Sequence, residues 1–165
     1  MEEANAPFAT QFAAEIPFLI QLERLLTVPT NLQMCHRDLW SDNLPPAASG
    51  GVCVIDWENC GLAAPAQELP MALLDFCAGD QARTATLYAA YLDAGGHARL
   101  LRRGDFTMVI AQFGHFWEMA VETYLAPSAS EATKAHSLER IAEALESPLR
   151  LEHIDAVLDW TRAVH

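Results

Sequence analysis

The hydrophobic positions of the chain recur mostly at helical spacing. Apolar residues three or four positions apart predict helices over residues 17–27, 67–78, 80–94, 106–124, 131–145 and 148–158. Pro17 suits a first helical turn, Asp80 suits an N-cap, and Ser128 with Glu131 has the pattern of a capping box. Most of the chain is therefore expected to be helical.

Two short segments have a different pattern, which is typical of strands. Residues 32–35 predict a short strand, and Val52-Cys53-Val54-Ile55 is a continuous β-branched run that predicts a fully buried strand. Turn residues Gly50 and Gly51 precede the second segment. The pattern predicts an α+β fold that is mainly helical, in which 165 residues form one domain with a small β element near its front.

The net charge of the chain argues against nucleic acid as a binding partner. The formal net charge is −12, and Lys134 is the only lysine, so the chain lacks the clustered cations that binding to nucleic acid requires. No apolar run reaches the roughly 18 residues of a membrane span, and the acidic start is unlike a signal peptide. We expect a cytoplasmic protein that binds neither nucleic acid nor membrane. The sequence does not predict an oligomeric state.

The four cysteines form no C-x-x-C pair, and in a cytoplasmic protein we expect their thiols to be reduced. A zinc site built from Cys35, His36, Cys53 and Cys60 would match no standard finger spacing. The cysteines therefore predict no zinc site.

Polar residues whose side chains could take part in catalysis or metal binding are concentrated at positions 35–43, which read CHRDLWSDN. Asp38 and Asn43 lie five positions apart, and Asp56 directly follows the predicted strand at 52–55. Their oxygens are hard ligands suited to Mg²⁺, and phosphoryl transfer needs such ligands together with a carboxylate that orients the attacking hydroxyl. Taken singly, Asp38 and Asn43 could also be turn formers and Asp56 a strand cap. The joint arrangement favours the catalytic interpretation.

These residues carry a resemblance to a known family. Residues 36–43 (HRDLWSDN) and 54–58 (VIDWE) resemble the catalytic core of aminoglycoside phosphotransferases and their choline-kinase-like relatives, and residues 61–69 resemble the family's next segment. The resemblance is specific over residues 33–74. It implies the C-terminal lobe of a protein-kinase-like fold, with a lead-in helix at 10–30, catalytic and metal loops at 32–60 and a helical subdomain at 66–165.

The resemblance also implies roles for individual residues. Asp38 would be the catalytic base, Asn43 and Asp56 would hold the Mg²⁺ of bound ATP, and His36 would brace the loop. The product would be a small molecule phosphorylated on a hydroxyl. Acidic side chains often meet substrate amines in this family, so Glu58, Glu118 and Glu122 are candidate substrate contacts for an amine-bearing acceptor. For Glu118 and Glu122, which follow His115 at helical spacing, a solvated helix face is the alternative.

The sequence departs from the family pattern before and after the motif. The 37 residues that precede Asp38 contain no glycine and no lysine, so we expect the nucleotide-clamping lobe to be absent from this chain and its isolated activity to be negligible. Pro45-Pro46 interrupt a short strand, and Ala64 stands where the family usually has Asp.

Three other interpretations remain. A non-catalytic kinase-like remnant would act as a binding or assembly module. A metal-dependent hydrolase would use the same carboxylates, but no set of histidines accompanies them. A protein kinase shares the H-R-D-x-x-x-x-N loop, yet only eight residues separate Asp56 from Pro65, which leaves little room for an activation loop.

Overall fold

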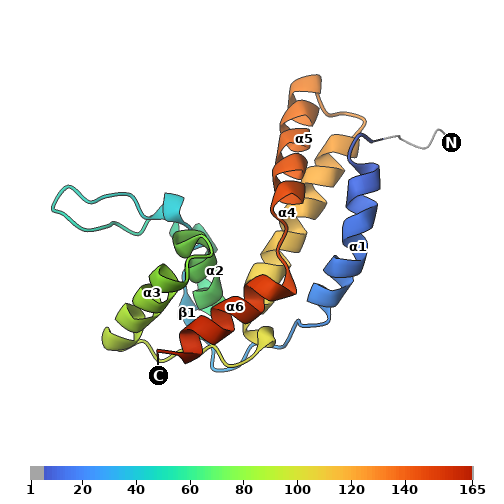
Figure 1. The fold of residues 1–165 in the computed structure, drawn as a ribbon. Coiled ribbons are helices and arrows are strands. Elements are labelled where there is room, and N and C mark those ends of the chain that lie inside the picture. Colours follow the sequence, from blue (N-terminus) through green and yellow to red (C-terminus); the bar gives the residue numbers. More distant parts are fainter. Residues whose placement is uncertain (1–5, 165) are drawn as a thin grey trace. The chain divides into compact units, whose positions relative to one another are not determined.

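The computed structural model describes residues 6–164 and confirms a mainly helical chain with one small sheet (Figure 1). Its long helices, in chain order, are α1 (Ala9–Glu23), α2 (Pro65–Cys77), α3 (Gln81–Asp93), α4 (Thr107–Leu125), α5 (Glu131–Glu146) and α6 (Leu151–Arg162). The strands are β1 (Gln33–Cys35) and β2 (Gly61–Ala63), and the short 3₁₀ helices are η1 (Ser41–Asn43), η2 (Trp57–Asn59) and η3 (Arg103–Phe106). No helix within residues 6–164 combines the length and the apolar character needed to cross a bilayer.

The described residues divide into two compact units. The first consists of Ile110–Arg150 with the part of the chain up to Arg24, and the second consists of Leu25–Val109 with the part from Leu151 onward. The expectation of a single domain stays a prediction.

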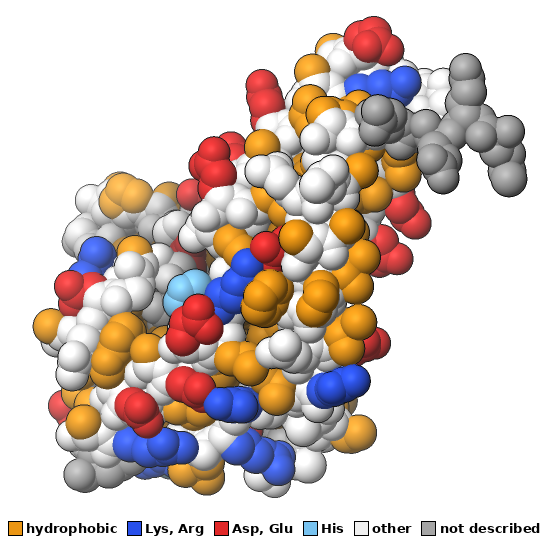
Figure 2. Space-filling model, turned by 45° about the vertical axis from the view of Figure 1, so that its right-hand side comes forward, with side chains coloured by type: hydrophobic (Ala, Val, Ile, Leu, Met, Phe, Trp, Pro, Cys, Tyr) orange, Lys and Arg blue, Asp and Glu red, His pale blue; other side chains and the backbone are white. Residues whose placement is uncertain are grey.

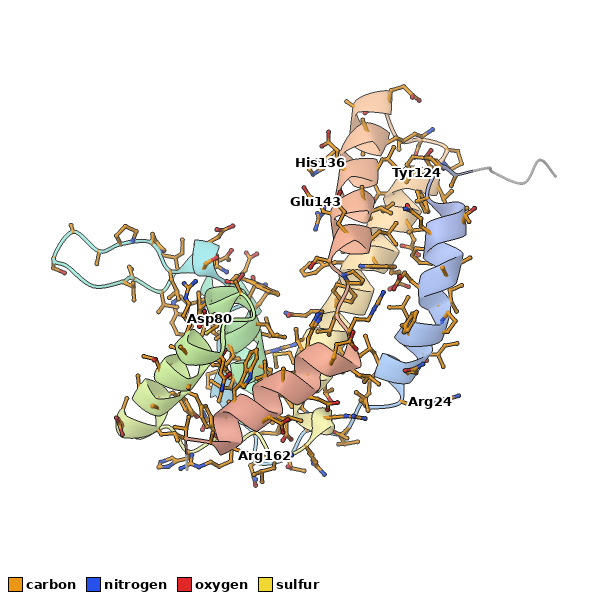
Figure 3. All side chains as sticks on the ribbon, in the orientation of Figure 1. Arg24, Asp80, Tyr124, His136, Glu143 and Arg162 are labelled. Atoms are coloured by element: carbon orange, nitrogen blue, oxygen red, sulfur yellow. The ribbon has the colours of Figure 1, made fainter. Side chains whose placement is uncertain are left out.

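The first unit packs α1, α4 and α5 around an apolar core. Phe8, Ala120 and Ile141 are buried at its centre, and the ring of Phe8 meets that of Tyr124 edge-on at 5.2 Å between centroids. Figure 3 shows Tyr124 near the end of α4. An ion pair joins the N-terminal and C-terminal segments of this unit, because the Arg150 guanidinium donates to Oε1 of Glu15 at 2.8 Å and lies 2.5 Å from Oε2.

The second unit carries the predicted motif. Its core is formed by α2, α3, α6 and η3, where the largest fully buried side chains are those of Met71, Leu73, Tyr88, Leu100, Phe106, Ile154 and Val157. The strands β1 and β2 pair antiparallel, with Met34 opposite Leu62 and Cys35 opposite Gly61. This pair precedes the motif on one side and leads into α2 on the other, so it fixes both ends of the segment that contains the predicted motif.

The buried strand predicted at 52–55 is wrong. Val52 forms an isolated bridge with Pro46, and the exposed fractions are 65% for Val52 and 43% for Ile55. Residues 52–55 and residues 43–47 form the two sides of an irregular loop that extends from the unit (Figure 1). Its amides donate from Cys53 to the Pro45 carbonyl at 2.8 Å and from Ile55 to the Asn43 carbonyl at 3.0 Å. The prolines have no N–H to donate in return, so no regular ladder forms.

Local signals placed the helix ends with mixed success. Asp80 caps α3 as predicted, since its carboxylate accepts the Arg83 amide at 2.8 Å, and Figure 3 shows it at the beginning of that helix. Ser130, rather than Ser128, caps α5. Pro17 lies inside α1 and not in its first turn, because the helix already begins at Ala9.

Apolar side chains remain at the surface of the second unit. Figure 2 shows them interspersed with charged groups on the face that it draws. Around the predicted motif the exposed ones have exposed fractions between 43% and 66%, and they are Met34, Val52, Ile55, Trp57 and Leu62.

Candidate active site

The predicted catalytic loop follows β1 and is anchored to α2. After Cys35 the backbone turns through Arg37, which has a left-handed conformation with φ of 67°. The Glu68 carboxylate of α2 accepts the Arg37 amide, and the Asp75 carboxylate accepts the Ser41 amide at 2.7 Å. Two carboxylates on the same face of α2, two turns apart, therefore hold the loop at its beginning and at the start of η1.

Asp38 lies half-buried in this loop with several donors on its carboxylate. The indole Nε1–H of Trp40 donates to Oδ1 at 2.7 Å, and the side-chain amides of Asn43 and Asn59 approach Oδ2 at 3.4 and 3.3 Å. The Asn43 amide also donates to the Asp38 carbonyl at 2.8 Å. The structure thus brings Asp38 and Asn43, two of the predicted residues, into direct contact.

The loop that contains Asp56 is joined to the Asp38 loop through the residue before it. The Ile55 amide donates to the Asn43 carbonyl at 3.0 Å, and the Nε2 of His36 lies 2.8 Å from the Ile55 carbonyl. Because a carbonyl oxygen only accepts, this bond requires the proton on Nε2. The buried His36 ring also meets the Trp57 ring edge-on at 4.7 Å. His36 therefore contacts both loops, and its bracing role stays a prediction.

The residues expected to hold a metal suit that chemistry. The amide nitrogen of Asn43 is engaged by Asp38, which leaves its side-chain oxygen as the atom for a cation. Asp56 is exposed, with φ of 61°, and presents a carboxylate at the surface. An amide oxygen and a carboxylate oxygen are ligands that Mg²⁺ accepts together with water and phosphate oxygens. Within residues 6–164 no cluster of three or more His, Cys, Asp or Glu side chains forms a metal cage, so such an ion would be held mainly by its other ligands.

The alternative zinc set does not assemble. Cys35 is buried and donates to the Ala63 carbonyl at 3.5 Å, whereas Cys53 and Cys60 are exposed. Burial, reinforced by the negative charge of Glu68, raises the pKa of the Cys35 thiol to about 11. A thiol that stays protonated at neutral pH is a poor metal ligand.

The candidate substrate residues are divided between the two units. Glu58 is exposed in η2, two residues after Asp56. Glu118 and Glu122 are exposed on α4 in the other unit, where the Glu118 carboxylate lies 3.9 Å from the Nδ1 of His115. Their assignment to substrate stays a prediction.

Two side chains at the site were not predicted. Trp40 and Asn59 both bind the Asp38 carboxylate. Trp40 is two residues from Asp38, but Asn59 is 21 residues away, and nothing local in the sequence places its amide there. A separate cavity of about 620 Å³ in the same unit, lined by His97, Arg99 and Arg102 among others, includes none of the predicted residues.

Comparison with known proteins identifies the family of the chain. Searches of curated proteins and of solved structures gave no match. The family model described as "Phosphotransferase enzyme family" matches residues 3–106, which is more than half of the chain and includes both loops. The chain therefore belongs to the phosphotransferase enzyme family.

Proposed function

We propose that this chain carries the catalytic loops of a small-molecule kinase of the aminoglycoside phosphotransferase type, which transfers the γ-phosphate of ATP to a substrate hydroxyl. The observation that carries the proposal is the environment of Asp38, whose carboxylate is fixed by hydrogen bonds beside Asn43 and next to the loop that presents Asp56. Phosphoryl transfer depends mainly on positioning and electrostatic stabilisation, and these contacts provide positioning. The fold that we propose around them is the C-terminal lobe of a protein-kinase-like protein.

In this proposal Asp38 orients the attacking hydroxyl and accepts its proton. The hydroxyl oxygen forms a bond to the γ-phosphorus while the bond from that phosphorus to the bridging oxygen of ADP breaks, and ADP leaves. Asn43 and Asp56 would hold Mg²⁺, which when bound supplies charge neutralisation at the phosphates. His36 keeps the Asp56 loop against the Asp38 loop through the Ile55 carbonyl.

The charge around the loops favours a cationic acceptor. Asp42 is exposed in the Asp38 loop, Asp56 and Glu58 are exposed in the loop joined to it, and the whole chain has a formal net charge of −12. Fields of this sign raise the local concentration of cations. We therefore propose an acceptor that carries an amine in addition to its hydroxyl, with Glu58 as the candidate contact in the unit that contains Asp38.

The test is ATP consumption by the natural gene product with a panel of amino alcohols and amino sugars. We expect Asp38→Asn to abolish turnover, because the carboxamide has no base to accept the proton. Asp42→Asn is the matched control, since Asp42 is an exposed carboxylate in the same loop. An unchanged rate in Asp38→Asn would refute the catalytic assignment.

A second candidate function is a non-catalytic kinase-like module that binds a partner. One observation favours it, namely the exposed apolar side chains around the motif. Isothermal calorimetry of residues 1–165 with Mg-ATP measures whether this chain alone binds the nucleotide. We expect weak binding by this chain alone, and tight binding would contradict our expectation that a further nucleotide-clamping element is needed.

A further inference from the structure

The Asp38 carboxylate has almost all of its hydrogen-bonding capacity filled. A carboxylate offers about four acceptor positions. Trp40 occupies one on Oδ1, and Asn43 and Asn59 approach Oδ2. About one position therefore remains, and it lies on Oδ1, next to the indole of Trp40.

The three donors do not contribute equally. The Trp40 contact, at 2.7 Å, has the length of a strong bond to a charged acceptor, whereas the two amide contacts are long, at 3.4 and 3.3 Å. An indole N–H is a donor only, so it cannot exchange roles with a hydroxyl that arrives at the same oxygen. The indole thus sets the rotation of the carboxylate more strongly than either amide does.

Asn59 acts on the same carboxylate from a different segment. It ends η2, which begins directly after Asp56, so its amide joins the Asp56 loop to Asp38 by a side-chain bond. This bond is separate from the backbone connection that passes through His36 and Ile55. A shift of the Asp56 loop would therefore be transmitted to Oδ2 of Asp38.

We propose that Trp40 and Asn59 are positioning residues for Asp38, and that the acceptor hydroxyl binds at the remaining position on Oδ1, beside the Trp40 indole. This inference rests on the proposed function, since it assigns the atom of Asp38 that receives the proton. It adds that Trp40 holds Oδ1 in place while Asn59 couples Asp38 to the loop of the proposed metal ligand.

The experiment compares single variants of the natural gene product. Trp40→Phe keeps an aromatic ring and removes the N–H, and Asn59→Ala removes the amide. Trp57→Phe is the matched control, because it removes an indole N–H that donates to the Val54 carbonyl at 2.9 Å and not to Asp38. We expect Trp40→Phe to lower kcat at least tenfold, about the value of one bond to a charged group, and to leave the KM for acceptor and ATP within about twofold. Asn59→Ala should lower kcat by a smaller factor, and the loss in Trp57→Phe, which leaves every donor to the Asp38 carboxylate in place, should be smaller still.

A spectroscopic measurement tests the contact without turnover. The indole ¹H–¹⁵N resonance of Trp40 is identified by its loss in Trp40→Phe, and that of Trp57 by its loss in Trp57→Phe. We expect Asp38→Asn to shift the Trp40 resonance upfield and to leave the Trp57 resonance in place. Circular dichroism of each variant verifies that it folds, and Trp40→His, which keeps a ring N–H, should recover part of the lost kcat.

The outcomes separate the two proposals. If Asp38→Asn abolishes turnover but Trp40→Phe behaves like Trp57→Phe, the proposed function stands and this inference is overturned. A Trp40 resonance that ignores Asp38→Asn also overturns it. If Asp38→Asn retains full turnover, the proposed function fails and the inference fails with it.

Discussion

Replacing His36 by Phe tests how firmly the two loops of the site are connected. The Nε2–H of His36 bonds to the Ile55 carbonyl at 2.8 Å, and the adjacent Ile55 amide donates to the Asn43 carbonyl. Phe keeps the edge contact with the Trp57 ring and removes the hydrogen bond. A single neutral hydrogen bond contributes about 1 kcal/mol net, and Ile55 is 43% exposed, so water can partly replace the donor. We therefore expect a loss of about 1 kcal/mol, confined to this region.

Hydrogen exchange at the Ile55 amide is the assay, because that proton is released only when the Asp56 loop separates from Asn43. A loss of about 1 kcal/mol corresponds to exchange that is about fivefold faster in His36→Phe. His36→Ala also removes the contact with Trp57, which is worth about another 0.5–1.5 kcal/mol, so its exchange should be faster still. His97→Phe, at an exposed histidine of the same unit, is the control. If His36→Phe exchanged at the wild-type rate while His36→Ala did not, ring packing rather than the hydrogen bond would connect the loops.

Three further predictions concern stability and reactivity. Asp80→Ala should lower the free energy of unfolding by about 1 kcal/mol through loss of the α3 cap, and an unchanged urea midpoint would contradict this. The Arg103 guanidinium, chiefly through its hydrogen bonds, holds the pKa of Asp155 below its usual value. That pair therefore stabilises the fold above the ordinary carboxyl range and loses its effect as the pH falls, so Arg103→Gln should flatten the acid side of a plot of stability against pH, an effect that salt should reduce. Burial raises the pKa of the Cys35 thiol to about 11, so the fold favours the protonated thiol. The contribution of this thiol to the free energy of unfolding is therefore lost as the pH rises toward 11. At pH 8 iodoacetamide should label the two exposed cysteines long before Cys35, and equal rates for the three would refute its assigned burial.

The helices could be predicted from the sequence because their determinants are local. The apolar spacing that predicted residues 106–124 gave nearly the observed bounds of α4, and Asp80 marked the beginning of α3 by the chemistry of its own side chain. The Val52–Ile55 segment failed because burial of a strand depends on what covers it and on the partner that pairs with it. Here the partner contains Pro45 and Pro46, which have no N–H, and a β-branched run carries no information about its partner.

The candidate site was predictable to the same extent. Asp38 and Asn43 are in contact because a short loop with one 3₁₀ turn brings them together, so their spacing of five residues was informative. Asn59 reaches Asp38 only through the path that the chain takes between residues 43 and 59, and that path includes the misjudged strand. The proposed residue that no local signal could find is therefore the one whose position depends on long-range geometry.

The backbone itself gives a further reason to regard these loops as functional. Arg37 and Asp56 both adopt left-handed conformations, with φ of 67° and 61°, which cost a residue with a side chain about 1–2 kcal/mol relative to glycine. Asp tolerates the left-handed region better than most residues, and at position 56 it also places a carboxylate in the loop. Arg is not favoured there, yet its amide is held by Glu68, which fixes the turn that delivers Asp38. The retention of strain at the residue before Asp38 and at Asp56 is what a site that must place two carboxylates requires.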